Sequence, residues 1–183
     1  MGKRSDFERV ERDFYPSPYA AVIPLFPHLA AGTHFDEPCC GDGALIKHLE
    51  KNGHVCSFFS DIEPQIDAPR LDVFSLTECR GDVFITNPPW DRKILHPLID
   101  HLTNLAPTWL LFDADWAHTV QSGPYMQYCR KIVSIGRVKW IEDSKMTGKD
   151  NACWYLFDKK ADGPTVFYGR KTDQSLNSAL FQF

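Results

Sequence analysis

A short polar cluster with two glycines is the first candidate for chemistry in this sequence. It reads Glu37-Pro38-Cys39-Cys40-Gly41-Asp42-Gly43 and closes a strand-like run over residues 33–37. Glycines at such a point let the backbone turn sharply and let a ligand approach it closely. Only G-x-G of the dinucleotide-binding fingerprint is present, so a plain tight turn between a strand and a helix remains an alternative explanation of this cluster.

Two acidic residues follow at the ends of later segments. Asp61 lies near the end of the run over residues 55–62, about 20 residues beyond the glycines, where a carboxylate can accept hydrogen bonds from the hydroxyls of a ribose. Asp72 lies one segment later, where its carboxylate can accept from an exocyclic amine while Val73 packs on a purine. A lone acid is more often a solvated strand end, but the ordered set favours a nucleoside-binding site.

The apolar run DVFIT, residues 82–86, ends on Asn87-Pro88-Pro89-Trp90. Proline has no amide hydrogen to donate to a sheet, so two consecutive prolines end the strand and fix the backbone of the turn that follows. The turn then presents an amide side chain and a large aromatic ring. A rigid loop that covers an edge of the core is the alternative explanation.

These residues need a scaffold that brings strand ends together. Strand-like runs alternate with helix-like segments, which favours an α/β domain with a mainly parallel sheet, and ligands bind at the carboxyl edge of such sheets. We expect strands over residues 33–37, 55–62, 82–86 and 109–114, an extended piece over 71–76, and helices over 17–30, 44–51 and 93–105. The runs at 131–141 and 151–158, joined by a polar loop, predict a closing antiparallel hairpin.

Length and composition narrow the classes of protein. The 183 residues suit one domain, and a formal net charge of -4 argues against a strongly basic protein while allowing local basic patches. The six cysteines form no C-x-x-C pair, so we expect free thiols in a reducing compartment and no metal site. No apolar run approaches a membrane span of about 20 residues, so we expect a cytoplasmic protein without a membrane partner.

Taken in order, these motifs resemble the class I S-adenosylmethionine-dependent amino-methyltransferases, and among them the N6-adenine DNA methyltransferases of phages and bacteria. YPSP at residues 15–18 is similar to the family's N-terminal cofactor motif, EPCCGDGAL to its glycine-rich motif, SDI and LDVF to its ribose and adenine contacts, and NPPW to its catalytic tetrapeptide. The resemblance covers nearly the whole chain. It implies that S-adenosylmethionine is held by Tyr15, Pro16, Ser17, Glu37, Pro38, Cys39, Gly41, Asp42, Gly43, Asp61, Ile62, Asp72, Val73 and Asn87.

The resemblance also implies a fold and a substrate. The fold is Rossmann-like, with a mostly parallel sheet of about seven strands that ends in an antiparallel hairpin. The substrate is DNA in a bacterium or a phage-infected cell. Because 183 residues leave no room for a large target-recognition region, we expect low or short sequence specificity. We expect a monomer or a homodimer.

The resemblance assigns catalysis to Asn87, Pro88, Pro89 and Trp90. The amine of adenine is a poor nucleophile because its lone pair is delocalised into the ring. The side-chain oxygen of Asn87 and the carbonyl of Pro88 would accept from its two N–H bonds and increase the charge on nitrogen. Pro89 would fix the direction of that carbonyl, and Trp90 would stack on a base flipped out of the duplex.

Several alternatives stay open. The same chemistry on adenine in RNA or on a protein glutamine fits the tetrapeptide, and a catalytically silent cofactor- or nucleic-acid-binding module is a rival of a different class. Basic residues follow the catalytic turn and surround the hairpin loop; these are Arg92, Lys93, Lys139, Lys145 and Lys149. A solvated face explains them, and our hypothesis is that they follow the phosphate backbone of the nucleic acid.

Overall fold

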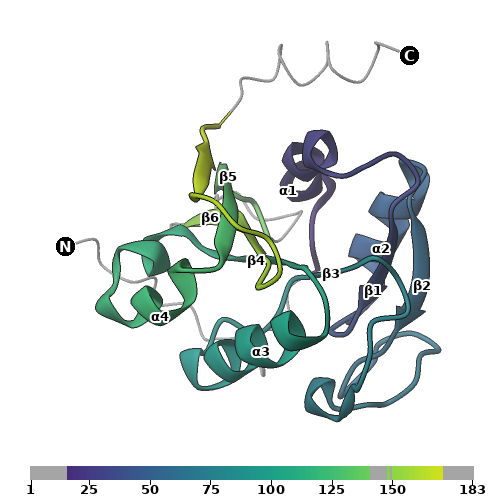
Figure 1. Ribbon diagram of the computed structural model, residues 1–183. Helices are drawn as coiled ribbons and strands as arrows, with labels where there is room; N and C mark the ends of the chain where they lie inside the picture. The colour runs from purple at the N-terminus through teal and green to yellow at the C-terminus, as the bar shows by residue number, and fades with distance from the viewer. Residues whose placement is uncertain (1–15, 141–147, 149, 171–183) are drawn as a thin grey trace.

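A single sheet of seven strands organises the described residues, which are 16–140, 148 and 150–170 of a computed structural model (Figure 1). The order across the sheet is β2-β1-β3-β4-β6-β5-β7. The strands are β1 (His34–Glu37), β2 (Val55–Phe59), β3 (Val83–Thr86), β4 (Thr108–Asp113), β5 (Cys129–Arg137), β6 (Asn151–Phe157) and β7 (Val166–Tyr168). Strands β2, β1, β3 and β4 run parallel, and β6 lies antiparallel between β4 and β5. The expected parallel sheet with an antiparallel hairpin is confirmed.

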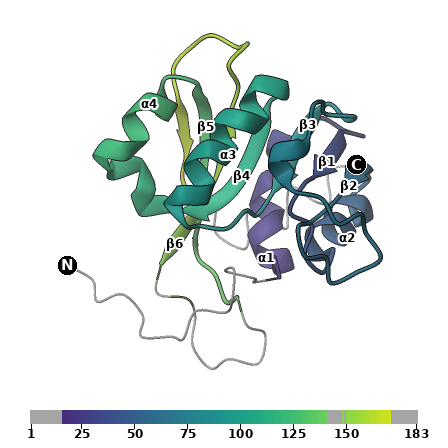
Figure 2. The same cartoon turned by 90° about the horizontal axis from the view of Figure 1, so that it is seen from below.

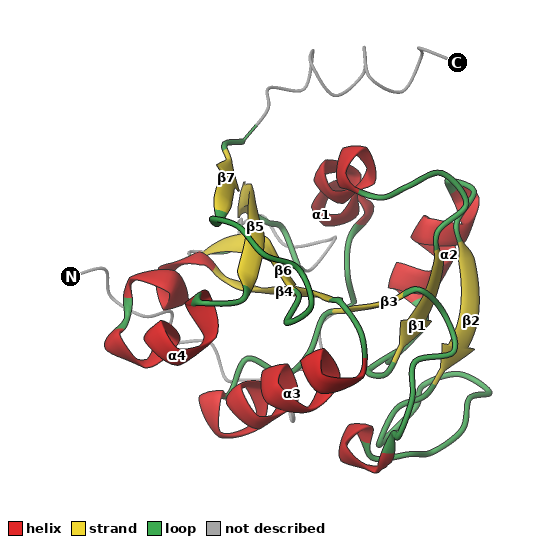
Figure 3. Cartoon of the chain, viewed as in Figure 1, coloured by secondary structure: helices red, strands yellow, loops and turns green. Residues whose placement is uncertain are grey.

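Helices cover both faces of the sheet. The short helix α1 (Tyr19–Val22), the 3-10 helix η2 (Ile23–His28) and α2 (Ala44–Lys51) pack on one face, and α3 (Arg92–Leu105) packs on the other. Figure 3 shows α1 and α3 on opposite sides of the central strands, and Figure 2 shows α3 over β4. Side chains of a strand alternate between faces, so Ile85 joins the first core cluster and Phe84 the second. Strands buried on both faces read as continuous apolar runs, as β3 and β4 do.

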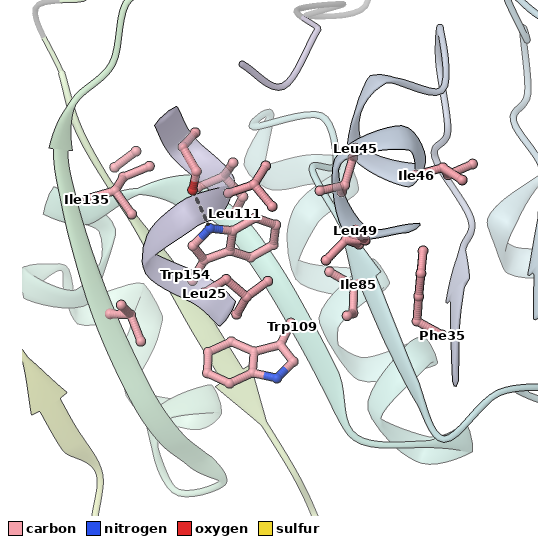
Figure 4. Close-up of a cluster of buried hydrophobic side chains, with 14 of the residues drawn as sticks. Leu25, Phe35, Leu45, Ile46, Leu49, Ile85, Trp109, Leu111, Ile135 and Trp154 are labelled. Atoms are coloured by element: carbon pink, nitrogen blue, oxygen red, sulfur yellow. Dashed lines mark hydrogen bonds between the residues drawn. The ribbon is translucent and has the colours of Figure 1, made fainter. Parts of the chain in front are cut away.

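A buried hydrogen bond fixes the N-terminal helix to the sheet. The indole nitrogen of Trp154 in β6 donates to the carbonyl of Ala21 in α1 at 2.8 Å, shown by the dashed line in Figure 4. Trp154 and Ala21 are fully buried, with Leu25 beside them in the same cluster. Because a buried carbonyl without a partner would destabilise the fold, this bond holds α1 at a defined position over the sheet.

The helix bounds follow local sequence signals. Helix α2 spans the predicted residues 44–51, and α3 begins at Arg92, one residue before the predicted start, because the Asp91 carboxylate accepts from the Lys93 amide at 3.0 Å and caps the first turn. The helix expected over 17–30 is α-helical only in α1 and continues as η2 to His28, since Pro24 and Pro27 interrupt the helical hydrogen bonds.

Three segments differ from the prediction. The extended piece expected over residues 71–76 is wrong for its centre, which forms the 3-10 helix η3 (Val73–Ser75) because Asp72 caps it, accepting from the Phe74 amide at 3.0 Å. The edge strand β7 was not predicted, and it pairs in parallel with β5. The strand expected over 55–62 ends at Phe59.

Three short helices connect β4 to β5. After β4 the chain forms η4 (Ala114–His118), η5 (Val120–Ser122) and the short helix α4 (Gly123–Met126). The six cysteines are free, as expected, and three of them are buried: Cys40, Cys129 and Cys153. Within the described ranges, no helix has both the length and the apolar character that crossing a membrane requires.

Candidate active site

A cavity of about 650 Å³ opens at the carboxyl ends of β1 and β3. Residues that the sequence assigned to the cofactor form most of its wall: Pro16, Ser17, Glu37, Pro38, Cys39, Gly41, Asp42, Asp61, Ile62, Asp72, Val73 and Asn87. Pro89, which the sequence assigned to catalysis, also lines it, whereas Gly43, Pro88 and Trp90 are not part of its lining. Tyr15, Lys145 and Lys149 lie outside the described residues.

The cavity wall includes residues that the sequence did not assign to the cofactor or to catalysis. They are Cys40, Leu45, Glu63, Gln65, Phe74, Ile94 and Leu98. Ile94 and Leu98 lie one turn apart on α3, and in a sequence this spacing is typical of the buried face of a helix. Phe74 is 42% exposed and Ile62 49% exposed, so the mouth of the cavity offers uncovered apolar side chains. A flat apolar ligand group would cover them.

The glycine turn shapes the entrance to α2. Gly41 and Gly43 have positive φ angles of 49° and 73°, and the Gly43 amide donates to the Cys40 carbonyl at 2.7 Å. A Cβ atom on Gly43 would lie 2.9 Å from Cδ1 of Ile66. Gly43 therefore acts through its backbone conformation, while Gly41 reaches the cavity itself.

Asp61 joins the glycine turn to the end of β2. Its Oδ2 atom accepts from the Gly41 amide at 2.9 Å, and its Oδ1 atom accepts from the Glu63 amide at 2.7 Å. A carboxylate has about four acceptor positions, so two hydrogen bonds leave room for two more. Asp61 can therefore hold the two loops in place and still accept hydrogen bonds from a ligand.

Glu37 carries a buried carboxyl group at the end of β1. The residue is 1% exposed, and neither carboxylate oxygen has a hydrogen-bond partner among the described residues. Burial raises the pKa of Glu37 well above its usual range, and the negative charge of Asp61 adds to that rise. The nearby Thr86 hydroxyl and Cys39 amide oppose the rise in pKa, but neither makes a hydrogen bond of normal geometry to Glu37. A cationic ligand group would satisfy this carboxylate.

The turn Asn87-Pro88-Pro89-Trp90 directly follows β3 and leads into α3. The Asn87 side-chain nitrogen donates to the Ser17 hydroxyl at 3.2 Å, and the Trp90 indole nitrogen donates to the Asn87 side-chain oxygen at 3.3 Å. The ring of Trp90 also contacts Trp140 edge to face. Trp140 follows the end of β5, and no motif in the sequence connects this residue with the turn.

Of the predicted basic residues that the structure describes, Arg92 lies near an acidic side chain. Arg92 donates to the Gln121 side chain at 2.9 Å, and its charge opposes the rise that burial causes in the pKa of Asp113. Asp115 and Asp150 also act on Asp113 and raise its pKa further. The described surface beside the turn therefore has mixed charge. Lys93 and Lys139 are exposed.

No family model matches this sequence, and no curated protein matches it. Solved structures do match. A protein from Pyrococcus horikoshii that has been assigned as an RNA methyltransferase superposes with a TM-score of 0.63 at 13% identity, over 86% of this chain and 92% of that protein. This chain has the Rossmann-like methyltransferase fold.

Two further structures have the same methyltransferase fold. A type I restriction-modification methyltransferase subunit from Streptococcus thermophilus has a TM-score of 0.59 at 10% identity, covering 91% of this chain but only 52% of the subunit. A dimethyladenosine transferase from Plasmodium falciparum has a TM-score of 0.54 at 18% identity, covering 80% of this chain and 64% of that one. The predicted fold class is thus confirmed, and at these identities the likeness concerns the fold.

Proposed function

We propose that this protein transfers a methyl group from S-adenosylmethionine to the exocyclic N6 amine of adenine in DNA. One observation carries the proposal: Asn87 and Pro89 of the catalytic turn line the same cavity as Glu37, Gly41 and Asp61. Glu37, Gly41 and Asp61 suit a nucleoside that carries a cationic group. They lie in the same cavity as Asn87, which suits a planar amine. The cavity of about 650 Å³ is of a size typical for cofactor sites.

The residues present fit S-adenosylmethionine. The unsatisfied carboxylate of Glu37 suits the ammonium group of the methionine part. The remaining acceptor positions of Asp61 suit the ribose hydroxyls. Ile62 and Phe74 suit the adenine ring, because their exposed apolar surfaces would be covered by it. Each part of the cofactor thus has a matching group in the wall.

The turn residues would then activate the target amine. S-adenosylmethionine, when bound, supplies a methyl group on a positively charged sulfur. The amine nitrogen would form a bond to the methyl carbon as the carbon–sulfur bond breaks, with the electron pair staying on sulfur and the proton passing from nitrogen to water. The Asn87 side-chain oxygen, which accepts from Trp90, would also accept from one N–H of the substrate amine. The Pro88 carbonyl would accept the other N–H.

The test uses isotope-labelled S-adenosylmethionine with unmodified DNA, RNA and cell protein, followed by nucleoside analysis. We expect label in N6-methyldeoxyadenosine. Asn87→Ala should lower the rate by about 100-fold or more, the usual effect of removing a group that stabilises the transition state. Asn104→Ala, which removes an exposed amide that bonds Lys159, is the matched control and should keep the rate. Unchanged transfer by Asn87→Ala would contradict the proposed chemistry.

Adenine in RNA is the second candidate. The structures similar to this chain include, by their names, methyltransferases of RNA and of restriction-modification systems. Among the described residues beside the turn, the mixed charge also supplies no continuous basic track for a duplex. Label in N6-methyladenosine of RNA would favour this candidate, and label in a protein glutamine would favour the third substrate. Calorimetry that detects no binding of S-adenosylmethionine would instead favour a silent module.

A further inference from the structure

The orientation of the Asn87 carboxamide decides what the catalytic turn offers to a substrate. A rotation of 180° about the last side-chain bond exchanges its oxygen, which accepts hydrogen bonds, with its nitrogen, which only donates. The amine of adenine needs acceptors. A carboxamide in the other orientation would therefore turn a donor toward the substrate and oppose the reaction.

Two contacts fix that orientation. The indole nitrogen of Trp90 is only a donor, so the Asn87 atom that faces it at 3.3 Å must be the oxygen. The nitrogen of Asn87 then faces the Ser17 hydroxyl at 3.2 Å, and the Ser17 oxygen acts as the acceptor. The carboxamide is thus held at both of its ends.

Ser17 is well suited to hold a partner in place. It is 5% exposed and lies between Pro16 and Pro18, whose rings restrict the backbone on both sides. The backbone of Ser17 opposes the lowering that burial causes in the pKa of His48 on α2. Pro18 is the N-cap residue of α1, and Trp154 anchors this helix to the sheet through its hydrogen bond to Ala21. The Ser17 hydroxyl therefore has a fixed position.

We infer that Ser17 is a positioning residue that orients the catalytic Asn87 carboxamide. The sequence assigned Ser17 to the cofactor, because YPSP is similar to a cofactor motif. The hydrogen bond to Asn87 instead connects the N-terminal segment with the turn 70 residues later. This inference rests on the proposed function, since it gives the orientation of Asn87 a catalytic purpose.

Kinetics separate positioning from cofactor binding. Ser17→Ala should lower kcat about tenfold, as loss of one hydrogen bond would, while the Kd of S-adenosylmethionine stays within about twofold. Ser17→Thr keeps the hydroxyl and should restore most of the rate. In the Asn87→Ala background, Ser17→Ala should have no further effect, because the two residues act as one unit. A weaker cofactor affinity with unchanged kcat would overturn the inference in favour of a cofactor contact.

A second measurement does not depend on turnover. The side-chain NH2 signals of Asn87 can be assigned in an NMR spectrum by their loss in Asn87→Asp. Ser17→Ala should shift these signals and speed their exchange with solvent. The control Ser122→Ala removes another buried, hydrogen-bonded hydroxyl that does not line the cavity and should leave them unchanged. Unchanged Asn87 signals in Ser17→Ala would overturn the inference even if no substrate is ever methylated, whereas shifted signals without turnover would sink only the proposed function.

Discussion

The indole rings of Trp90 and Trp140 meet edge to face, with their centroids 5.6 Å apart and their planes at 85°. Trp90 belongs to the turn between β3 and α3, and Trp140 comes from the hairpin that closes the sheet. Gly148 lies against Trp140 as well, because a Cβ atom on this glycine would come within 3.2 Å of the Trp140 ring. The proposed stacking face is thus supported from a distant part of the chain.

Removing that support should weaken substrate binding. An aromatic pair of this geometry contributes about 0.5–1.5 kcal/mol beyond its buried area, so we expect Trp140→Ala to raise the substrate KM by up to about tenfold. Trp140→Phe keeps an aromatic ring and should recover most of the affinity. Steady-state kinetics over a range of substrate concentrations measures this effect. Asn151→Ala changes an exposed residue at the start of β6, on the other strand of the hairpin, and is the control; equal KM values for it and Trp140→Ala would refute the prediction.

The buried carboxyl group of Glu37 should make stability depend on pH. Its pKa in the folded state lies above its ordinary value, so the unliganded protein loses stability as pH rises from that ordinary value through the raised pKa. Below the ordinary pKa the penalty is absent. Glu37→Gln removes the ionising group, so the variant should be more stable than the original chain at neutral pH and equally stable in acid. Thermal unfolding at both pH values measures the difference.

The same substitution should have the opposite effect on cofactor binding. If the Glu37 carboxylate pairs with an ammonium group, Glu37→Gln should weaken S-adenosylmethionine binding and remove most of its pH dependence. In the unaltered protein, affinity should rise with pH, because binding favours the ionised carboxyl group. Calorimetric titration across this range is the measurement. Identical pH profiles for the two proteins would show that Glu37 does not hold the cation.

Asp61→Asn tests the double role of Asp61. Asparagine has one acceptor oxygen, so the amide of either Gly41 or Glu63 loses its partner, which costs roughly 1–3 kcal/mol of stability. We also expect weaker binding of S-adenosylmethionine. Asp82→Asn is the matched control, since Asp82 accepts from the His34 amide at 3.1 Å outside the cavity and should change stability alone. Urea unfolding and calorimetry report the two quantities separately.

Lys93 is the described basic residue that best tests the phosphate hypothesis. It is exposed at the start of α3, whereas Arg92 is occupied by Gln121. Lys93→Glu should weaken nucleic-acid binding and reduce the slope of log affinity against log salt by about one or two. Lys160→Glu reverses an exposed charge beyond the far end of β6 and serves as the control. Equal salt slopes for all three proteins would remove Lys93 from the binding surface.

The sequence predicted those helices and strands whose signals are local patterns of residues, and it predicted the fold class from the order of the motifs. Helix α2 has the predicted bounds, because the signals for it lie within a few residues of the helix. These signals are the spacing of its apolar residues and Gly53 just beyond its end. The 3-10 helix η3 was missed because the Asp72 side chain competes with an extended backbone, a contact that period-two alternation does not report. Strand β7 has only three residues and lies at the edge of the sheet, so its signal was too short to detect.

The site shows the same division. The sequence placed Glu37, Asp61 and Asn87 in one region because all three follow strands that end at the same edge. It did not predict that Ser17 bonds Asn87 or that Trp140 supports Trp90, because these pairs depend on where distant segments meet. Contacts between residues that are distant in the sequence leave no periodic pattern or fixed spacing from which they could be predicted.

The hydrogen bond from Trp154 to Ala21 has a consequence for the newly synthesised chain. The segment that carries Ser17 emerges from the ribosome early, but its anchor in β6 emerges more than 100 residues later. Until β6 pairs with β4 and β5, nothing fixes α1 over the sheet through this bond. A nascent chain arrested before residue 151 should therefore contain every residue of the cavity wall and yet be unable to align the Asn87 amide.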